Sequence, residues 1–445
     1  MRNNLKGIIL ILIPIIGIAI SYALTSQQYV IVLFILLLSL YLVLISYSRK
    51  MVAILIIISV PLNWIAIQIG NVYISLFDAT IILGLLYLVM AILTNKERLH
   101  FGKLEALLVV FIAISALSIT VAIDKAESLS MLLNILKGFS AFMIITSILK
   151  DTDDLRSAIK ANTVAASILA IFSIIQYFFI GGTGLGHFRA DSIFHNANLF
   201  ANYMIFSIPL CVYLVIHYRR IKRFFTSSLL IIMITAFSIT FSRGGLIGLA
   251  AGLLCFLFTI KKKRMAIITA AVILVFIIMG YFVLFPKSAV GEEWAFRIGR
   301  IKGRAADVRI ELAQEAINMM KSNPFLGVGI GNFEVLGSKY GDDTTFGMIS
   351  HNVYLEVGAE TGIFGLLVYL LILIIFIFNL WQARQEAASD DDLYMVIAIL
   401  AAFIGISVHY VFFSGFRELF WIILAFGSVL YKYSISSSSM GISEV

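Results

Sequence analysis

The chain has 445 residues and a formal net charge of +8; 61% of its residues are hydrophobic and only 13% are charged. Soluble domains are about half apolar and about a quarter charged, so this excess is too large for a buried core alone. Mean hydropathy is +1.02, and the apolar residues come in runs of about twenty, the length of a membrane-spanning helix. The composition excludes a soluble enzyme, a disulfide scaffold and a nucleic-acid-binding module. It predicts an all-α polytopic membrane protein embedded in a lipid bilayer.

Fourteen apolar runs are candidates for membrane-spanning helices. In chain order they cover residues 7–24, 28–47, 51–69, 75–94, 104–122, 129–149, 158–180, 199–217, 224–241, 244–260, 265–285, 353–380, 394–411 and 416–433. Weak neighbouring runs can fuse or re-enter, so we expect 12–14 transmembrane helices and one large loop with short helices. The predicted parts are N-terminal helices (1–180), helices joined by arginine-bearing turns (181–285), the loop (286–352), and C-terminal helices with a tail (353–445).

Positive charges alternate between the loops and predict the orientation of the chain. Every second short loop is basic, with Arg49, Lys50, Lys96, Arg98, Lys103, Lys150, Arg156, Lys160, Arg219, Arg220, Lys222, Arg223 and residues 261–264. The short loops on the other side hold only Lys125, Arg189, Arg243 and Arg417. Because cytoplasmic loops carry the excess of lysine and arginine, we expect both termini in the cytoplasm and the 286–352 loop outside the cell.

Arg243 lies in a two-residue turn between two long apolar runs, followed by Gly244 and Gly245. An arginine in so tight a turn costs several kcal/mol if it meets lipid unpaired. The two glycines leave space for a close backbone or ligand approach. The residue is either an arginine that reaches for the outer interface or an anion-binding arginine that faces a cavity, and we favour the second interpretation.

Arg309 precedes a stretch with helical periodicity at residues 308–321, where Asp307 is the predicted N-cap and Ser322 the predicted end. This places Arg309 in the first helical turn, where the helix dipole disfavours a cation. A bound anion would explain a cation there, since helix N-termini bind phosphates. A surface arginine that faces Asp307 or Glu311 explains the spacing equally well.

His351 ends the large loop, and Asn352 and an apolar helix follow it. A histidine at such an interface is usually a hydrogen-bonded structural residue. Its ordinary pKa near 6.5 also suits a general base. The arginines expected on the same side, Arg189 among them, favour the catalytic interpretation.

Several other features indicate no chemistry by themselves. The glycines of the Gly327–Gly331 segment, Gly329 and Gly331 among them, predict a turn whose backbone N–H groups could face a phosphate. Residues 151–153 and 390–392 are interpreted as solvated charge runs on the cytoplasmic side, and both cysteines as packing residues. No group of histidine, cysteine and acidic residues has metal-ligand spacing. Lys137 is a cation within an apolar run, and the sequence assigns it no role.

Four motifs together resemble the bacterial O-antigen ligase/polymerase superfamily. The most extensive is Asn323-Pro-Phe-Leu-Gly-Val-Gly-Ile-Gly-Asn-Phe333, followed by His351-Asn-Val-Tyr-Leu-Glu-Val-Gly-Ala-Glu-Thr-Gly362. The others are the Ser242–Gly245 turn, Arg309 before its helix, and the 188–198 segment with Arg189 and Asn198. The chain departs from the family pattern at Ala197, where proline is common, and at Leu312, where tryptophan is common.

The resemblance implies a metal-independent, inverting glycosyltransferase without a cofactor in a bacterial cytoplasmic membrane. Its donor would be a glycan linked to a polyprenyl diphosphate such as undecaprenyl diphosphate, and its acceptor a glycan or a lipid carrier. Arg243 and Arg309 would stabilise the diphosphate while His351 handles the acceptor proton. Arg189, Asn198, Asn352, Gly329 and Gly331 would contact substrate.

Two alternatives stay open at this point. Within the family, a ligase and a polymerase differ in acceptor, and the motifs do not separate them. From another class, a multi-pass transporter or flippase with an outer anion site fits the apolar runs. Transporters carry polar groups near the membrane midplane, whereas the polar groups of this sequence concentrate on one side.

Overall fold

The computed structural model describes residues 48–63, 66–69, 72–97, 99, 101–180, 189–259, 304–341, 345, 347–414 and 418–441. The predicted spans 7–24, 28–47 and 265–285 lie outside these residues, as does the first part of the large loop. Within the described part of the chain, nine helices are long and apolar enough to cross a membrane, and two more apolar helices are shorter. These helices confirm an all-α polytopic membrane protein.

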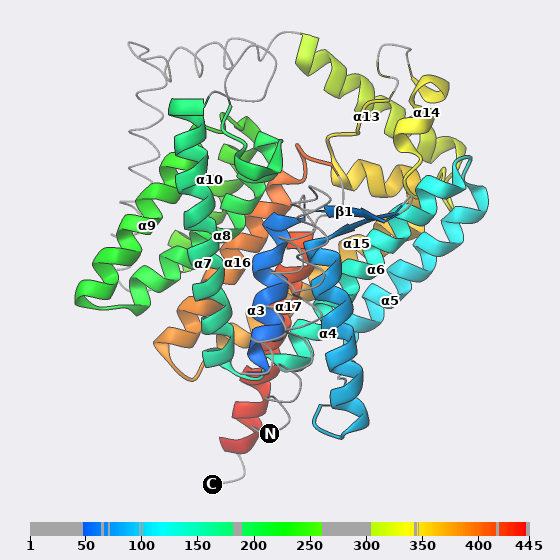
Figure 1. Ribbon diagram of the computed structural model, residues 1–445. Coiled ribbons are helices and arrows are strands. Elements are labelled where there is room, and N and C mark those ends of the chain that lie inside the picture. Colours follow the sequence, from blue (N-terminus) through cyan, green and yellow to red (C-terminus); the bar gives the residue numbers. More distant parts are fainter. Residues whose placement is uncertain are drawn as a thin grey trace, which may run out of the picture.

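The described part of the chain is almost entirely helical (Figure 1). The helices are α3 (Lys50–Ser59), α4 (Leu76–Leu93), α5 (Lys103–Ser118), α6 (Lys125–Ile148), α7 (Thr152–Ile175), α8 (Ala197–His217), α9 (Arg220–Ser238), α10 (Arg243–Thr259), α13 (Arg304–Ser322), α14 (Phe333–Tyr340), α15 (Val353–Gln385), α16 (Asp390–His409) and α17 (Glu418–Gly441). Short helical turns occupy Val60–Leu62, Ile119–Val121, Gln176–Ile180 and Ser192–Phe194. The two strands are β1 (Ala66–Ile69) and β2 (Val72–Ser75).

The predicted span at residues 51–69 is wrong in its second half. The helical segment ends at Leu62, and β1 then pairs with β2 as an antiparallel hairpin in which Ala66 lies opposite Ser75. Pro61 lacks a backbone donor and its ring disfavours continuing the helix. From Lys50 to Leu62 the helical rise gives about 20 Å, less than the ~30 Å hydrocarbon core. Hydropathy alone cannot distinguish this apolar hairpin from a helix.

Helices α8 and α16 form the buried centre of the bundle, and α10 packs closely on α16 through small residues. A Cβ added at Gly252 would lie 2.4 Å from the backbone oxygen of Ala401, and one at Gly248 would lie 2.6 Å from that of Gly405. Small residues allow such close approach of helix backbones. This packing places Arg243, the first residue of α10, beside the last turn of α16.

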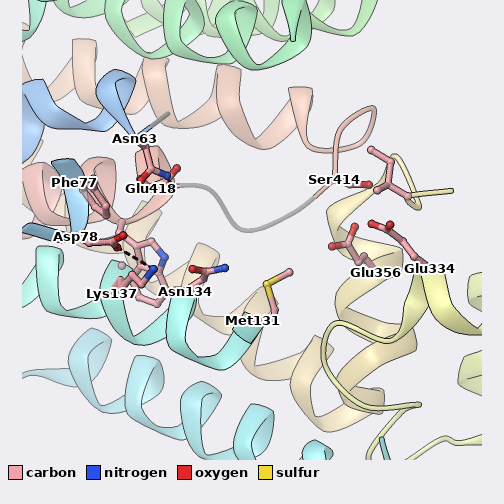
Figure 2. A pocket seen from close by; sticks show the side chains of 13 residues that line it. Asn63, Phe77, Asp78, Met131, Asn134, Lys137, Glu334, Glu356, Ser414 and Glu418 are labelled. Carbon is pink, nitrogen blue, oxygen red and sulfur yellow. Dashed lines mark hydrogen bonds and ion pairs between the residues drawn. The ribbon is translucent and has the colours of Figure 1, made fainter. Parts of the chain in front are cut away.

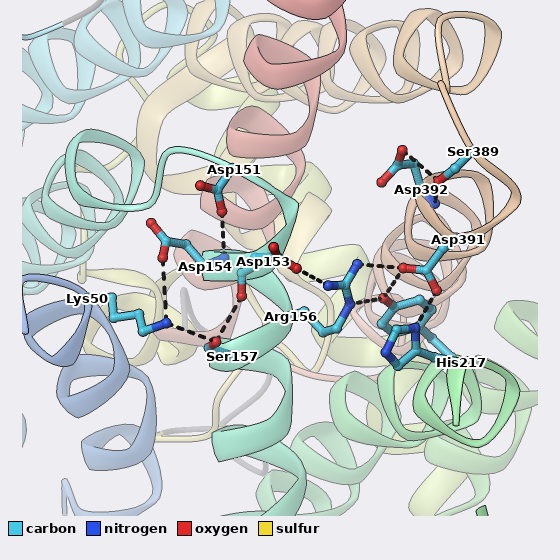
Figure 3. A network of polar contacts seen from close by, with 11 residues as sticks. Lys50, Asp151, Asp153, Asp154, Arg156, Ser157, His217, Ser389, Asp391 and Asp392 are labelled. Carbon is cyan, nitrogen blue, oxygen red and sulfur yellow. Dashed lines mark hydrogen bonds and ion pairs between the residues drawn. The ribbon is translucent and has the colours of Figure 1, made fainter. Parts of the chain in front are cut away.

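Helices α13 and α14 lie together at one end of the bundle, and α17 ends at the other (Figure 1). We call these ends the loop face, which carries α13 and α14, and the far face, where α7 and α16 begin. Polar contacts join helices on the far face (Figure 3). Asp391 accepts a hydrogen bond from Tyr213 Oη (3.0 Å), pairs with His217 Nδ1 (2.6 Å) and forms an ion pair with Arg156.

These contacts correct in part the interpretation of residues 151–153 and 390–392 as solvated charge runs. Asp153 and Asp390 are exposed as expected, but the other aspartates make specific contacts. Asp151 caps α7 by accepting from the backbone N–H of Asp154 (2.7 Å), and Asp154 in turn faces Lys50 at 3.8 Å. Asp392 is buried and accepts from Ser389 Oγ (2.8 Å). Helix N-termini favour carboxylates, so both runs begin helices and one of them also joins three helices through Asp391.

Candidate functional site

The Gly327–Gly331 segment follows α13 and packs on the turn between α5 and α6. Ile330 donates its backbone N–H to Ser118 Oγ (3.0 Å) and accepts from Ser128 Oγ (2.6 Å). The Asn332 side chain accepts from the backbone N–H of Asp124 (2.8 Å) and donates to its carbonyl (3.0 Å). These contacts couple the last part of the large loop rigidly to the membrane helices.

Gly329 and Gly331 have positive φ angles of 98° and 75°, a conformation that glycine adopts readily. The Gly329 N–H donates to the backbone oxygen of Glu360 (3.0 Å), and the Gly331 N–H donates to the Glu360 side chain. A Cβ at Gly329 would lie 2.5 Å from Ala122. Both N–H groups are therefore used inside the protein, in contrast to the expected turn that faces a phosphate.

Arg309 lies in the second turn of α13, since that helix begins at Arg304 rather than after Asp307. The free N–H groups of the helix start therefore do not surround Arg309, and the capping role expected for Asp307 is wrong. The helix does end at Ser322 as predicted.

The buried face of α13 is formed by Leu312, Ala316 and Met319, which pack with Phe333 of α14. Ile310, an apolar residue of the predicted helix, is 69% exposed and lies outside this buried face. This packing holds the helix that carries Arg309 against the rest of the loop.

His351 is held between the large loop and the end of α16. Its backbone φ angle of +54° is unusual for a residue other than glycine. Two residues on, the Val353 N–H lies 3.0 Å from both the Tyr410 and Phe413 carbonyl oxygens. Asn352 caps α15 by accepting from the backbone N–H groups of the next turn at 3.0 and 3.1 Å. The Asn352 oxygen expected to contact substrate therefore has a structural partner.

Arg243 begins α10 directly beside these elements. Ser242 caps the helix by accepting from the Gly245 N–H (3.2 Å). A Cβ added to Gly244 would lie 2.7 Å from Cβ of Phe412, in the turn that follows α16. The glycine after Arg243 therefore permits the close contact that places this arginine next to the start of α15.

Arg309 interacts electrostatically with both Arg243 and His351. Desolvation lowers the pKa of Arg309, and the positive charge of Arg243 lowers it further. Desolvation likewise lowers the pKa of His351 from 6.5, and Arg309 adds to the effect. Two cations held close in a partly desolvated place attract an anion. A lowered pKa keeps the imidazole neutral near pH 7, the form that accepts a proton.

Arg189 and Asn198 support this group from one side. The Arg189 guanidinium donates to the Thr240 carbonyl (2.8 Å) and to Asn198 Oδ1 (2.9 Å). The same Asn198 oxygen accepts from Ser242 Oγ (3.0 Å), next to Arg243. Both residues therefore fix the turn that presents Arg243, and the structure brings them together as the sequence motifs suggested.

Sequence reasoning missed a cavity on the same face, lined by Asp78, Lys137, Glu356 and Glu418 among others (Figure 2). Its one signal in the sequence was Lys137, a charge inside an apolar run. Within the described ranges, no group of three or more histidine, cysteine, aspartate or glutamate side chains is arranged to hold a metal ion.

Comparison with known proteins identifies the segment that carries these residues. Residues 228–370 match the family model described as O-Antigen ligase. None of the curated proteins compared with the chain matches it. A chain from a solved peptidoglycan synthase complex shares 10% identity and a TM-score of 0.43, over 75% of this chain and 97% of that one. The matched segment includes Arg243, Arg309 and His351, so residues 228–370 are similar to the O-antigen ligase family, and the resemblance predicted from the motifs is confirmed over this segment.

Proposed function

We propose that the protein is a membrane glycosyltransferase that moves a glycan from a polyprenyl-diphosphate donor to an acceptor hydroxyl, in the polymerisation or ligation of a surface polysaccharide. The convergence of Arg243, Arg309 and His351 on the loop face is the observation that carries this proposal. The three residues come from α10, α13 and the segment before α15. The electrostatic effects of Arg243 on Arg309 and of Arg309 on His351 indicate that they lie near one another. The match of residues 228–370 to the O-antigen ligase family supports the same conclusion.

The arrangement suits displacement of a diphosphate. The acceptor oxygen attacks C1 of the donor sugar and the C1–oxygen bond to the diphosphate breaks, so the leaving group takes the electron pair. Arg243 and Arg309 stabilise the charge that develops on this leaving group. His351 accepts the proton of the acceptor hydroxyl. Attack opposite the leaving group inverts the configuration at C1.

We further propose that this reaction takes place on the outer surface of the cytoplasmic membrane. A group of ion pairs lies away from α13 and α14. Its basic members are Arg49, Lys50, Lys150 and Arg156, and its acidic members are Glu97, Asp153, Asp154 and Asp391. Short cytoplasmic segments are the ones enriched in lysine and arginine. This distribution supports a cytoplasmic far face and an extracytoplasmic loop face, where a lipid diphosphate can lie with its chain in the bilayer.

The test uses purified protein, the organism's polyprenyl-diphosphate repeat unit and a gel that separates glycan products. We expect His351→Ala to lower turnover by about 10²–10⁴-fold, the usual contribution of a general base. Arg309→Gln should lower it by about 10²–10³-fold through loss of charge stabilisation. His217→Gln, a change to another histidine on the far face, serves as the matched control and should retain activity.

The products distinguish the remaining alternatives. A ladder formed from donor alone identifies a polymerase, and transfer only after a cell-surface acceptor fraction is added identifies a ligase. Unchanged turnover in His351→Ala would contradict the role of that residue. Movement of the lipid-linked glycan across proteoliposome membranes, without consumption of the donor, would instead establish the transporter.

A further inference from the structure

A polar cavity of about 230 Å³ opens on the loop face beside the candidate site. Figure 2 shows two groups of side chains in its wall. One group contains Asn63, Asp78, Lys137 and Glu418, and the other contains Glu334, Glu356 and Ser414. The remaining lining residues include Phe77, Asn134 and Trp421. We call this cavity the acidic pocket.

The charge of the acidic pocket is opposite to that of the arginine pair. Among the described residues that line it, Asp78, Glu334, Glu356 and Glu418 supply carboxylates and Lys137 supplies a cation. Lys137 Nζ lies 2.9 Å from Asp78 Oδ1, so that pair is internally neutralised. Desolvation raises the pKa of Glu334, and Glu127 raises it further, as expected where carboxylates crowd together. Such a pocket repels a diphosphate and favours hydroxyl or ammonium groups.

The indole of Trp421 points to a ligand in this pocket. Trp421 is only 2% exposed, and it lines the cavity together with Gly138. Within the described ranges its Nε1–H makes no hydrogen bond, and this edge of the ring lies over Gly138, where an added Cβ would be 2.1 Å from Nε1. Buried indole N–H groups usually have a partner. A ligand hydroxyl in the cavity would supply that acceptor, and the ring would pack against the apolar face of a sugar.

The other wall groups complement a sugar in the same way. Glu418 Oε1 accepts from the Asn63 side chain (2.9 Å), which fixes the carboxylate and leaves lone pairs for hydroxyl donors. Lys137 uses one of its three donors on Asp78. The cavity volume lies close to the lower limit for ligand pockets, which is about 300 Å³. The cavity therefore suits one sugar ring rather than a long chain.

Ser350 joins the acidic pocket to His351. Its hydroxyl donates to Glu356 Oε2 (2.7 Å) and lies 3.0 Å from Ser414 Oγ, and both partners line the cavity. The same hydroxyl accepts from the Asn352 N–H (3.2 Å). One wall of the pocket is therefore built on the segment that carries His351, so a sugar bound there is adjacent to the proton acceptor.

We propose that the acidic pocket is the acceptor subsite, and that it binds a neutral or amine-bearing sugar ring whose hydroxyl faces His351. The inference rests on the proposed glycosyl transfer and assigns its two substrates to sites of opposite charge. The diphosphate of the donor binds at Arg243 and Arg309, and the carboxylates keep it out of the pocket. The acceptor sugar binds among Glu334, Glu356 and Trp421.

Binding is measured by the fluorescence of Trp421, with a lipid-free neutral oligosaccharide released from the organism's own surface glycan as the probe. We expect a saturable change in the intact protein that is absent in Trp421→Phe, which retains the other three tryptophans of the chain. Asn134 is exposed on α6 and has room beside it. Asn134→Trp should fill the pocket and weaken binding at least tenfold, measured by calorimetry, whereas Asn134→Ala should not.

Donor binding and turnover separate this inference from the proposed function. Glu418→Gln should raise KM for the acceptor at least fivefold while KM for the donor stays within twofold. Inorganic pyrophosphate should bind less tightly to Arg309→Gln and equally well to Asn134→Trp. Oligosaccharide that binds Asn134→Trp as tightly as the intact protein would overturn the acceptor subsite and leave the transferase intact. Oligosaccharide binding to the pocket without any glycosyl transfer would overturn the transferase instead.

Discussion

His351 combines a constrained backbone with an electrostatic environment set by a second residue. Its positive φ is stabilised by the contacts of the α15 start, and Arg309 lowers the pKa of its imidazole together with desolvation. The neutral form therefore persists to a pH below 6.5. A general base in this state stays active in mildly acidic conditions, because fewer imidazoles are protonated at a given pH.

Arg309→Gln is predicted to shift the acid limb of the pH profile to higher pH. Removing the positive charge lets the pKa of His351 rise toward 6.5, so activity is lost earlier as pH falls. The measurement is kcat/KM against pH, which reports the free enzyme. Lys321→Gln changes a cation at the far end of the same helix and is the control. An acid limb that stays in place in Arg309→Gln would show that the two residues do not interact.

Asn352 lets capping be separated from substrate binding. Its Oδ1 accepts two backbone N–H groups of α15, so Asn352→Ala should cost about 1 kcal/mol of stability. Asn352→Asp keeps the acceptor and removes the amide donors. We expect thermal unfolding to return to nearly the original temperature in Asn352→Asp, with turnover retained. Full stability with lost turnover would instead assign the amide to substrate, as the sequence suggested.

The sequence predicted which charged residues converge, but not how the polar backbone is satisfied. Arg243 was singled out because an arginine between two apolar runs is costly without a partner. Arg309 was singled out by its place at a predicted helix start, and His351 by a pKa that suits a general base. Gly329, Gly331 and Asn352 looked like ligand contacts because their partners cannot be read from local spacing. The partner of both glycines is Glu360, about thirty residues further along the chain.

At the scale of elements, close packing of the loop against α15 depends on glycine. Gly362 has φ +69° at a break within α15, and a Cβ there would lie 2.3 Å from the Phe325 carbonyl oxygen. The Ile363 N–H donates to the Pro324 carbonyl (2.8 Å), so this break anchors the chain just after α13. The position of Arg309 therefore depends on a turn some fifty residues further along.

Gly362→Ala is predicted to destabilise the protein far more than Gly347→Ala. Both glycines have positive φ, and a left-handed conformation costs a side chain about 1–2 kcal/mol. Only Gly362 adds a clash with backbone atoms, since a Cβ at Gly347 meets nothing within 4 Å. Thermal unfolding in detergent measures the difference. Equal unfolding temperatures for the two variants would mean that the backbone at Phe325 shifts to accommodate the added Cβ.

Element boundaries were predicted well where proline marks them and poorly where capping or packing decides. The end of α13 at Ser322 was predicted from the proline two residues further along. In contrast, α7 and α16 begin several residues before the predicted spans at 158 and 394, because Asp151 and Ser389 cap them. The β1–β2 hairpin and the buried face of α13 were not predicted from the sequence. An apolar residue such as isoleucine fits a strand, a lipid-facing helix or a buried core, so its presence does not distinguish them. Ile310 is such a residue, apolar in the pattern yet exposed in the structure.

The whole molecule separates its charges along the bundle. The loop face carries the arginine pair and the acidic pocket, and the far face carries ion pairs between Arg156 and its neighbours (Figures 2 and 3). In the proposed reaction, two sites of opposite charge on one face would let an anionic donor and a neutral acceptor bind together without competing. The proposed reaction therefore requires that both substrates reach the same side of the membrane.

Labelling of single cysteines by a membrane-impermeant maleimide in intact cells tests this orientation. Replacing Cys211 and Cys255 by alanine removes the two native thiols. Met348→Cys then places a thiol at an exposed position near His351, and Asp153→Cys places one on the far face, where that side chain is 83% exposed. Because basic residues gather on the far face, we expect labelling of the first variant in intact cells and of the second only after permeabilisation. The opposite pattern would put the arginine pair in the cytoplasm, where the lipid-linked glycan would have to be used before it is exported.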